Sequence, residues 1–212
     1  MPLPIDFYFD FSCPYAYLGS TQLEKIERET GAIVRLRPFL LGGVFRHLGQ
    51  PQNMSTVLSA PKKHHNRADL LRWANWFEAP LRRPHQHPNR TVEALRCLLA
   101  SPEDRRRDVM RSLYRAYWCD SEDIRDLVVL RRALDRLGLD GVKIVEEAQT
   151  QPIKEKLRAC TAEAIDRGVF GAPSWVVGDQ LFWGQDRIEM VKRATTGWNA
   201  THGVDFDFNQ NS

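Results

Sequence analysis

The first 30 residues most constrain the fold, because strand periodicity changes to helical periodicity there across a single Cys-Pro step. Over 5–11, one isoleucine and three phenylalanines alternate with aspartate and tyrosine, which predicts a strand with one face strongly buried. Cys13-Pro14 interrupts this pattern, and proline is favoured at the first position of a helix. We therefore expect a strand, a tight turn and a helix that runs to about Thr30.

The later signals complete a thioredoxin-like order. In chain order they are a strand over 32–39, a long region of helical period after Gly42-Gly43, strands over 174–177 and 180–183 joined by the hairpin turn Gly178-Asp179, and a helix over about 186–196. The order βαβ, helices, ββα predicts an α/β thioredoxin-like fold with a large all-helical insertion. We assign 1–45 and 169–212 to the thioredoxin-like domain and 46–168 to the helical insertion domain.

Capping signals divide the helical region. Ser101-Pro102-Glu103-Asp104 predicts a helix start with an N-cap, a first-position proline and acidic residues in the first turn. Asp120-Ser121-Glu122-Asp123 predicts a second start, for a helix that ends at Gly138. A third helix is expected between Pro152 and Gly168.

Composition and charge exclude several classes of protein. No apolar stretch approaches the roughly 20 residues that span a bilayer, and the first residues lack the features of a secretory signal, so we expect a cytoplasmic protein without a membrane segment. The net charge is +3, and the run Arg105-Arg106-Arg107 is typical of a solvated helix face, with anion binding as the alternative. We expect no nucleic-acid partner, because no recognition module or interleaved aromatic pattern is found.

Cys13 is the candidate reactive residue among four widely spaced cysteines. Their spacing contains no Cys-x-x-Cys pair, which argues against a metal site and against a local disulfide framework. At the start of a helix, free N–H groups and the helix dipole stabilise a thiolate, so Cys13 is expected to have a lowered pKa. The alternative is a small, inert buried residue. We assign that structural role to Cys97, Cys119 and Cys160.

Two short loops near the C-terminal strands are further candidates. Ala172-Pro173 precedes a strand, and a cis peptide at such a bend would leave the Ala172 backbone free to pair with an extended, peptide-like ligand. A simple loop-to-strand joint explains the same residues. Asp186 either caps the last helix or holds the ammonium group of a ligand.

Three motifs and one helical pattern resemble a known family. They are Asp-Phe-Tyr-Phe-Asp-Phe-Ser-Cys-Pro-Tyr-Ala-Tyr-Leu-Gly at 6–19, Val-Phe-Gly-Ala-Pro-Ser at 169–174, Trp-Gly-Gln-Asp-Arg at 183–187 and Lys-x6-Asp-Leu-x-Arg-Trp-Ala from Lys62 to Ala74. The chain is similar, over nearly its whole length, to the 2-hydroxychromene-2-carboxylate isomerase family, which is related to kappa-class glutathione transferases and bacterial disulfide oxidoreductases.

This resemblance implies a dimeric enzyme that uses glutathione and acts on a small aromatic substrate. Carried over by position, the glutathione-binding residues are Cys13, Asn53, Lys62, Ala172, Pro173, Gln185 and Asp186. Cys13 would face the glutathione sulfur, Ala172 would pair with the tripeptide backbone, and Gln185 and Asp186 would hold its γ-glutamyl end. Lys62 and Asn53 would reach it from the insertion, which suits a cation that faces a carboxylate.

The sequence departs from the family pattern at the first turn. Family members usually carry serine where Cys13 stands, and the disulfide oxidoreductases have a second cysteine where this chain has Ala16. Cys13 could therefore form a mixed disulfide with glutathione but no internal disulfide in this turn. It could activate glutathione as serine does in relatives, or it could itself be the nucleophile.

The resemblance implies a cis–trans isomerisation by thiol addition, bond rotation and elimination on an aromatic unsaturated pyruvate, or a related kappa-type transfer. The alternatives are a monothiol thiol–disulfide oxidoreductase that uses Cys13 with glutathione, and a non-catalytic glutathione-binding protein. Tyr15, Tyr17 and Trp118 are candidates for the acceptor pocket, with burial in the core as the alternative. Basic residues over 82–90 are candidates to attract the substrate carboxylate.

Overall fold

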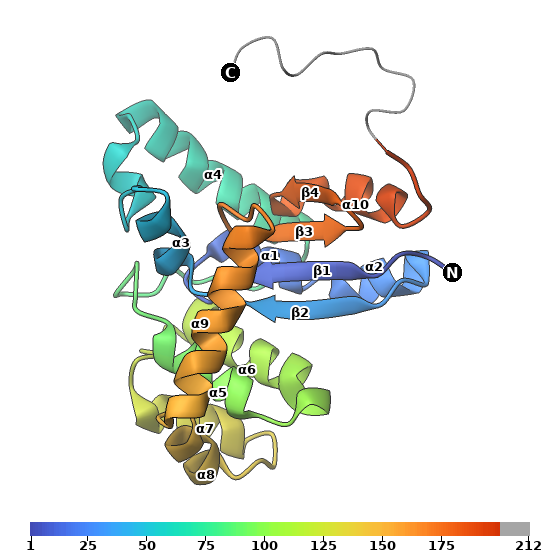
Figure 1. Ribbon diagram of the computed structural model, residues 1–212. Helices are drawn as coiled ribbons and strands as arrows, with labels where there is room; N and C mark the ends of the chain where they lie inside the picture. The colour runs from blue at the N-terminus through green and yellow to red at the C-terminus, as the bar shows by residue number, and fades with distance from the viewer. Residues whose placement is uncertain (200–212) are drawn as a thin grey trace.

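The computed structural model describes residues 1–199, built around one mixed four-stranded sheet (Figure 1). The strands are β1 (Ile5–Phe9), β2 (Val34–Pro38), β3 (Ser174–Val177) and β4 (Gln180–Trp183). The α-helices are α1 (Pro14–Ser20), α2 (Leu23–Thr30), α3 (Leu41–His47), α4 (Ala60–Trp76), α5 (Val92–Ala100), α6 (Arg106–Trp118), α7 (Leu127–Asp135), α8 (Gly141–Glu147), α9 (Gln151–Asp166) and α10 (Ile188–Ala194). Short 3-10 helices are η1 (Met54–Val57), η2 (Glu103–Arg105) and η3 (Gln185–Arg187).

The sheet order β2-β1-β3-β4 places β1 between two partners. It pairs in parallel with β2 and antiparallel with β3, while β3 and β4 form the predicted hairpin. All five residues of β1 are buried, which corrects the expectation of a single buried face. Helices cover both faces of the sheet, so the alternating polar positions are buried as well; Tyr8, for example, donates from its hydroxyl to Glu163 on α9 at 2.7 Å.

The helices lie on both faces of the sheet and beyond its edges (Figure 1). Figure 1 shows α9 across one face and α1 and α2 on the other, with α5 to α8 gathered beyond the β2 edge. Helix α4 projects from the opposite end and contacts α1. The predicted thioredoxin-like fold with a helical insertion is thus confirmed. The part of the predicted domain assignment that covers 200–212 lies outside the described residues.

Several predicted boundaries move inward. Strand β1 ends at Phe9 and not at residue 11, and the long first helix is two helices, α1 and α2. The break occurs at Thr21, whose backbone N–H and hydroxyl both donate to Leu18 O, at 3.2 and 2.7 Å. A polar side chain that bonds back to the preceding turn competes with helix propagation. The last predicted helix likewise divides into η3 and α10.

Two predicted helix caps are corrected. Asp126, and not the acidic run 120–123, caps α7, because its carboxylate accepts from Val128 N at 2.8 Å. The hydroxyl of Ser101 donates to Cys97 O at 2.7 Å and so closes α5, leaving the next segment to begin as η2. No helix among residues 1–199 is both long enough and apolar enough to cross a membrane.

A buried carboxylate joins the end of β1 to the helical region. Asp10 is 1% exposed and accepts hydrogen bonds from Ser12 N at 2.9 Å, Leu41 N at 2.8 Å and Thr91 Oγ1 at 2.7 Å. Burial raises the pKa of Asp10, and these donors counteract the shift. Asp10 therefore fixes the turn before α1, the start of α3 and the residue that precedes α5.

Replacement of this carboxylate should destabilise the fold. In Asp10→Asn the new amide NH2 group, itself a donor, would face the donors that the carboxylate accepts from. Each hydrogen bond to a charged group contributes about 1.5–3 kcal/mol to the free energy of unfolding. We expect the free energy of unfolding, measured in urea, to fall by about 2 kcal/mol or more. The matched control is Asp104→Asn at an exposed position, which should change it by about 0.5 kcal/mol at most. Equal effects of the two substitutions would contradict the role given to Asp10.

Candidate active site

Cys13 lies at the N-terminus of α1, where the chain turns out of β1. It is the N-cap residue, with Pro14 at the first helical position as predicted. Its backbone N–H donates to Asp10 O at 3.2 Å, and its carbonyl accepts from Tyr17 N at 3.1 Å. The residue is 9% exposed, and its thiol donates to Ala172 O at 2.9 Å. The first turn is thus joined directly to the loop before β3.

The expected lowering of the Cys13 pKa is wrong for this arrangement. The pKa of the Cys13 thiol is raised to about 12, mainly by burial and to a smaller extent by the negative charge of Asp10, although the backbone N–H groups of Ala16 and Tyr15 lower it. The free-energy cost of removing a thiolate from water exceeds the stabilisation that two N–H groups at the start of a short helix provide. Cys13 is therefore a protonated hydrogen-bond donor at neutral pH.

A groove of about 230 Å³ runs beside this turn and holds four residues predicted to bind glutathione: Ala172, Pro173, Gln185 and Asp186. The Ala172-Pro173 peptide is cis, as considered from the sequence. Within residues 1–199, no group accepts a hydrogen bond from Ala172 N, although this residue lines the groove. An unpaired main-chain N–H in a groove is suited to an extended, peptide-like ligand.

The loop after β4 forms the opposite side of the groove. Gly184 has a φ of 115°, and a Cβ there would collide with the Asp186 carboxylate, so glycine is required. Its carbonyl accepts from Trp175 Nε1 at 3.0 Å, which holds the loop against the core. Asp186 lies inside η3 and its side chain caps no helix. The helix-capping role that the sequence allowed for it is therefore wrong. The exposed carboxylate of Asp186 lies 3.5 Å from Arg187 Nη1 and remains open to solvent at the edge of the groove.

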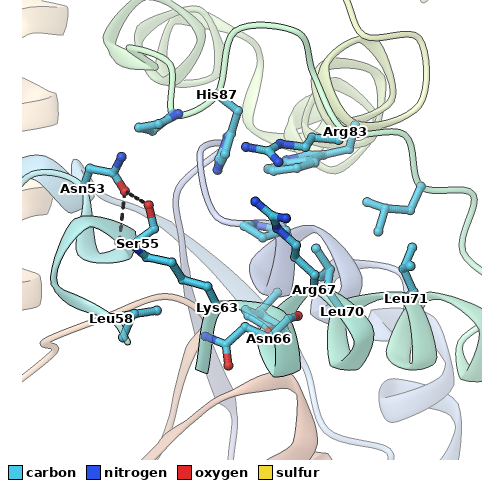
Figure 2. A pocket seen from close by; sticks show the side chains of 15 residues that line it. Asn53, Ser55, Leu58, Lys63, Asn66, Arg67, Leu70, Leu71, Arg83 and His87 are labelled. Carbon is cyan, nitrogen blue, oxygen red and sulfur yellow. Dashed lines mark hydrogen bonds between the residues drawn. The ribbon is translucent and has the colours of Figure 1, made fainter. Parts of the chain in front are cut away.

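A second cavity, of about 450 Å³, adjoins the groove, and Tyr15 lines both. Figure 2 shows Lys63 and Arg67 on α4 facing Arg83 and His87 across this cavity. Leucine, proline and tryptophan side chains complete the wall, and no aspartate or glutamate is among the lining residues. The cavity therefore combines an apolar wall with several cations that no lining carboxylate neutralises.

His87 is the most buried titratable residue of this wall. Its Nδ1 lies 3.0 Å from Tyr117 Oη, and its ring packs at 5.0 Å, centroid to centroid, against Trp118. Burial, and then the positive charge of Arg83, lower the pKa of His87 to about 4. The imidazole is therefore neutral at physiological pH.

The structure separates the remaining predicted glutathione residues from the groove. Asn53 lines the larger cavity, and its Oδ1 accepts from Ser55 N at 3.0 Å and Ser55 Oγ at 2.7 Å. Lys62 lies on α4 with an exposed side chain and lines neither cavity, while its neighbour Lys63 lines the larger one.

The three aromatic candidates for the acceptor pocket have different positions. Tyr15 and Trp118 line the larger cavity. The assignment of Tyr17 is corrected, because its ring is 5% exposed, packs on Tyr114, and donates from its hydroxyl to Pro80 O at 2.6 Å. Tyr17 is therefore a core residue, which was the alternative that the sequence allowed.

Several cavity residues were missed by the sequence analysis. Lys63, Arg67 and Leu70 recur at helical spacing, so a signal for one shared face of α4 was present. Arg83 lies within the basic stretch 82–90 that was considered, but the loop has no periodicity that singles it out. His87 carries no sequence signal, since a lone histidine in a loop does not indicate which cavity it reaches.

The protonated state of Cys13 predicts slow alkylation. With a pKa of about 12, its thiolate fraction at pH 8 is about 10⁻⁴, and the thiolate is the reactive form. We expect iodoacetamide labelling of the Cys13 peptide, followed by mass spectrometry, to rise about tenfold per pH unit from pH 7 to 10. Cys13→Ser reports the background from the other cysteines. A rate that reaches a plateau below pH 9 would contradict this assignment.

Comparison with known proteins gives consistent relationships. The model of the DsbA-like thioredoxin domain matches residues 4–196. A 2-hydroxychromene-2-carboxylate isomerase from Sphingobium xenophagum is 33% identical over 91% of this chain and 97% of its own length. Glutathione S-transferase kappa 1 from Rattus norvegicus is 26% identical over 90% of this chain and 89% of its own.

Solved structures show the same fold at lower identity. A 2-hydroxychromene-2-carboxylate isomerase superposes with a TM-score of 0.80 and 24% identity over 92% of this chain and 95% of that chain. The cytosolic disulfide reductase DsbM from Pseudomonas aeruginosa, solved with glutathione, has a TM-score of 0.64 and 17% identity over 92% of this chain and 98% of its own.

Proposed function

We propose a glutathione-dependent reaction for this chain, which belongs to the 2-hydroxychromene-2-carboxylate isomerase family of DsbA-like thioredoxin domains. The chain is an enzyme of the isomerase and kappa-transferase branch. The reaction proposed is the cis–trans isomerisation of an aromatic unsaturated pyruvate in equilibrium with 2-hydroxychromene-2-carboxylate. A kappa-type transfer to an aromatic acceptor would use the same two cavities.

The observation that carries this proposal is the junction of two unlike cavities beside Cys13. One is a narrow groove with a free main-chain N–H and the exposed carboxylate of Asp186, and the other is a wider apolar cavity with cations. Tyr15 lines both, so ligands in the two cavities would meet next to the first turn of α1. Such a junction suits a reaction between a peptide-like thiol and an aromatic acid.

The groove fits glutathione by the chemistry of its walls. Ala172 N would donate to the tripeptide backbone, and the Asp186 carboxylate would hold the γ-glutamyl ammonium group, with Gln185 beside it. When bound, glutathione supplies a nucleophilic sulfur. We place the cation that faces one of the two glutathione carboxylates on α4, where Lys63 lines the adjoining cavity and Lys62 lies one residue away. Asn53 is a further donor at that end.

The role of Cys13 follows from its protonation state. A buried thiol that already donates to Ala172 O is able to turn that donor toward a neighbouring sulfur, as a serine hydroxyl would. Its raised pKa argues against Cys13 as the attacking nucleophile. The same property, together with Ala16 in place of a second cysteine, argues against the alternative of a thiol–disulfide oxidoreductase.

The cations of the larger cavity orient the substrate. In Figure 2 the guanidinium groups of Arg67 and Arg83 approach one another from opposite walls. Arginine binds carboxylates through paired N–H donors, and this pair has no lining carboxylate to neutralise it. We assign the substrate carboxylate to them, with its ring against Leu70 and Trp118. A cytoplasmic location and a homodimeric assembly stay predictions.

The donor role of Cys13 predicts unequal effects of two substitutions. Cys13→Ser keeps a hydrogen-bond donor and should retain isomerase kcat within about tenfold, whereas Cys13→Ala should lose about 10²-fold, as loss of one preorganised donor does. Both are measured with 2-hydroxychromene-2-carboxylate and saturating glutathione. Complete inactivation by Cys13→Ser would favour the oxidoreductase alternative. Glutathione binding by wild type without turnover would favour a non-catalytic binding protein.

Arg83→Gln tests the carboxylate site. Loss of one charge-assisted hydrogen bond costs about 1.5–3 kcal/mol, so KM for the chromene should rise about 10- to 100-fold while KM for glutathione is unchanged. Arg82→Gln is the matched control, because Arg82 is exposed and lines neither cavity. If both variants change KM equally, general attraction by the basic stretch explains the result, and a specific site does not.

A further inference from the structure

His87 occupies a position that the proposed reaction does not yet use. It lines the larger cavity, on the wall that also carries Arg83, and Figure 2 shows it opposite the residues of α4. A neutral imidazole in the wall of a substrate cavity is the most common general base in enzymes. Its hydrogen bonds decide which ring nitrogen is free to act.

The contacts of Tyr117 indicate a tautomer for His87. The Tyr117 hydroxyl is positioned to donate to Gln86 O at 3.1 Å. With its proton used there, the Tyr117 oxygen accepts from His87 Nδ1, which lies 3.0 Å away, and we assign the ring hydrogen to Nδ1 on that basis. His87 Nε2 then keeps its lone pair, because its ring hydrogen is on Nδ1.

The loop that carries His87 is held in place by the segment before α7. His85 N donates to Ser121 Oγ at 3.2 Å, and Asn89 Nδ2 donates to Asp123 Oδ1 at 2.9 Å. The ring of His87 also rests against Trp118, whose indole N–H donates to Phe11 O at 2.9 Å. The imidazole is therefore fixed by contacts on both sides before any substrate arrives, as a catalytic base requires.

We propose that His87 is a catalytic base whose Nε2 takes the proton from the hydroxyl group of the chromene substrate. This inference rests on the proposed function. A 2-hydroxychromene-2-carboxylate carries a hydroxyl, a carboxylate and the ring oxygen on one carbon. Arg83 lines the same cavity as His87, and its positive charge acts on the imidazole. When Arg83 binds the substrate carboxylate, the hydroxyl on the same carbon is brought to the wall that carries His87.

The step is balanced within the substrate and His87. The O–H proton passes to Nε2, and the electron pair of that bond forms the ketone C=O bond. The bond from the same carbon to the ring oxygen breaks, and its electron pair stays on the phenolic oxygen. The imidazolium then returns the proton to that oxygen, so the ring opens without another reactant and His87 is regenerated neutral.

His87→Asn tests this role, since its amide can still donate to Tyr117 but has no group at the Nε2 position. General base catalysis contributes about 10²- to 10⁴-fold, so kcat for the chromene should fall at least about 10²-fold, with KM for glutathione changed less than about threefold. His85→Asn, in an exposed residue of the same loop that lines neither cavity, should keep the wild-type kcat. A His87→Asn variant that keeps kcat within about threefold would overturn the proposal.

The tautomer is measured independently on wild-type protein without substrate. In nitrogen-15 NMR at neutral pH, we expect the Nε2 resonance of His87 at the position of an unprotonated imidazole nitrogen, and Nδ1 at that of a protonated one. The reverse pattern would overturn the assignment even if His87→Asn does not fold. Wild-type protein that fails to isomerise the chromene would instead remove the proposed function, and the nitrogen resonances would then decide the His87 assignment alone.

Discussion

The buried carboxylate of Asp10 is the constraint on which the site depends. It follows the last residue of β1 and accepts hydrogen bonds from three separate parts of the chain, including the turn that leads to Cys13 and the residue before α5. Its own backbone carbonyl accepts from Cys13 N and from Tyr114 Oη on α6. Because one residue orients both the first turn of α1 and the helices around it, the position of the thiol and the walls near it are set together.

This arrangement also explains the chemistry of Cys13. A helix N-terminus stabilises a thiolate, but the thiol lies under the loop before β3 and close to the charge of Asp10. Burial outweighs the helix, so the turn provides a neutral donor. In this protonated state the cysteine offers a hydrogen-bond donor, as a serine hydroxyl at the same position would.

The order of strands and helices was predictable, because periodicity and turn residues carry it. The β3–β4 hairpin at Gly178-Asp179 and the start of α1 at Pro14 are examples. The pKa of Cys13 was not predictable, since it depends on burial by Ala172, which is 159 residues away in the sequence. Within the larger cavity, the difference between Lys62 and Lys63 is a rotation of about 100° around α4, and only the packing of that helix against α1 decides it.

We propose that Cys13 acts toward glutathione as a protonated donor and not as a redox thiol. A crystal structure of the complex with glutathione distinguishes these two roles. We expect the glutathione sulfur beside Cys13 Sγ at a non-bonded distance, with the tripeptide backbone on Ala172 in the groove. Continuous density between the two sulfur atoms, at the disulfide bond length of about 2.05 Å, would contradict it.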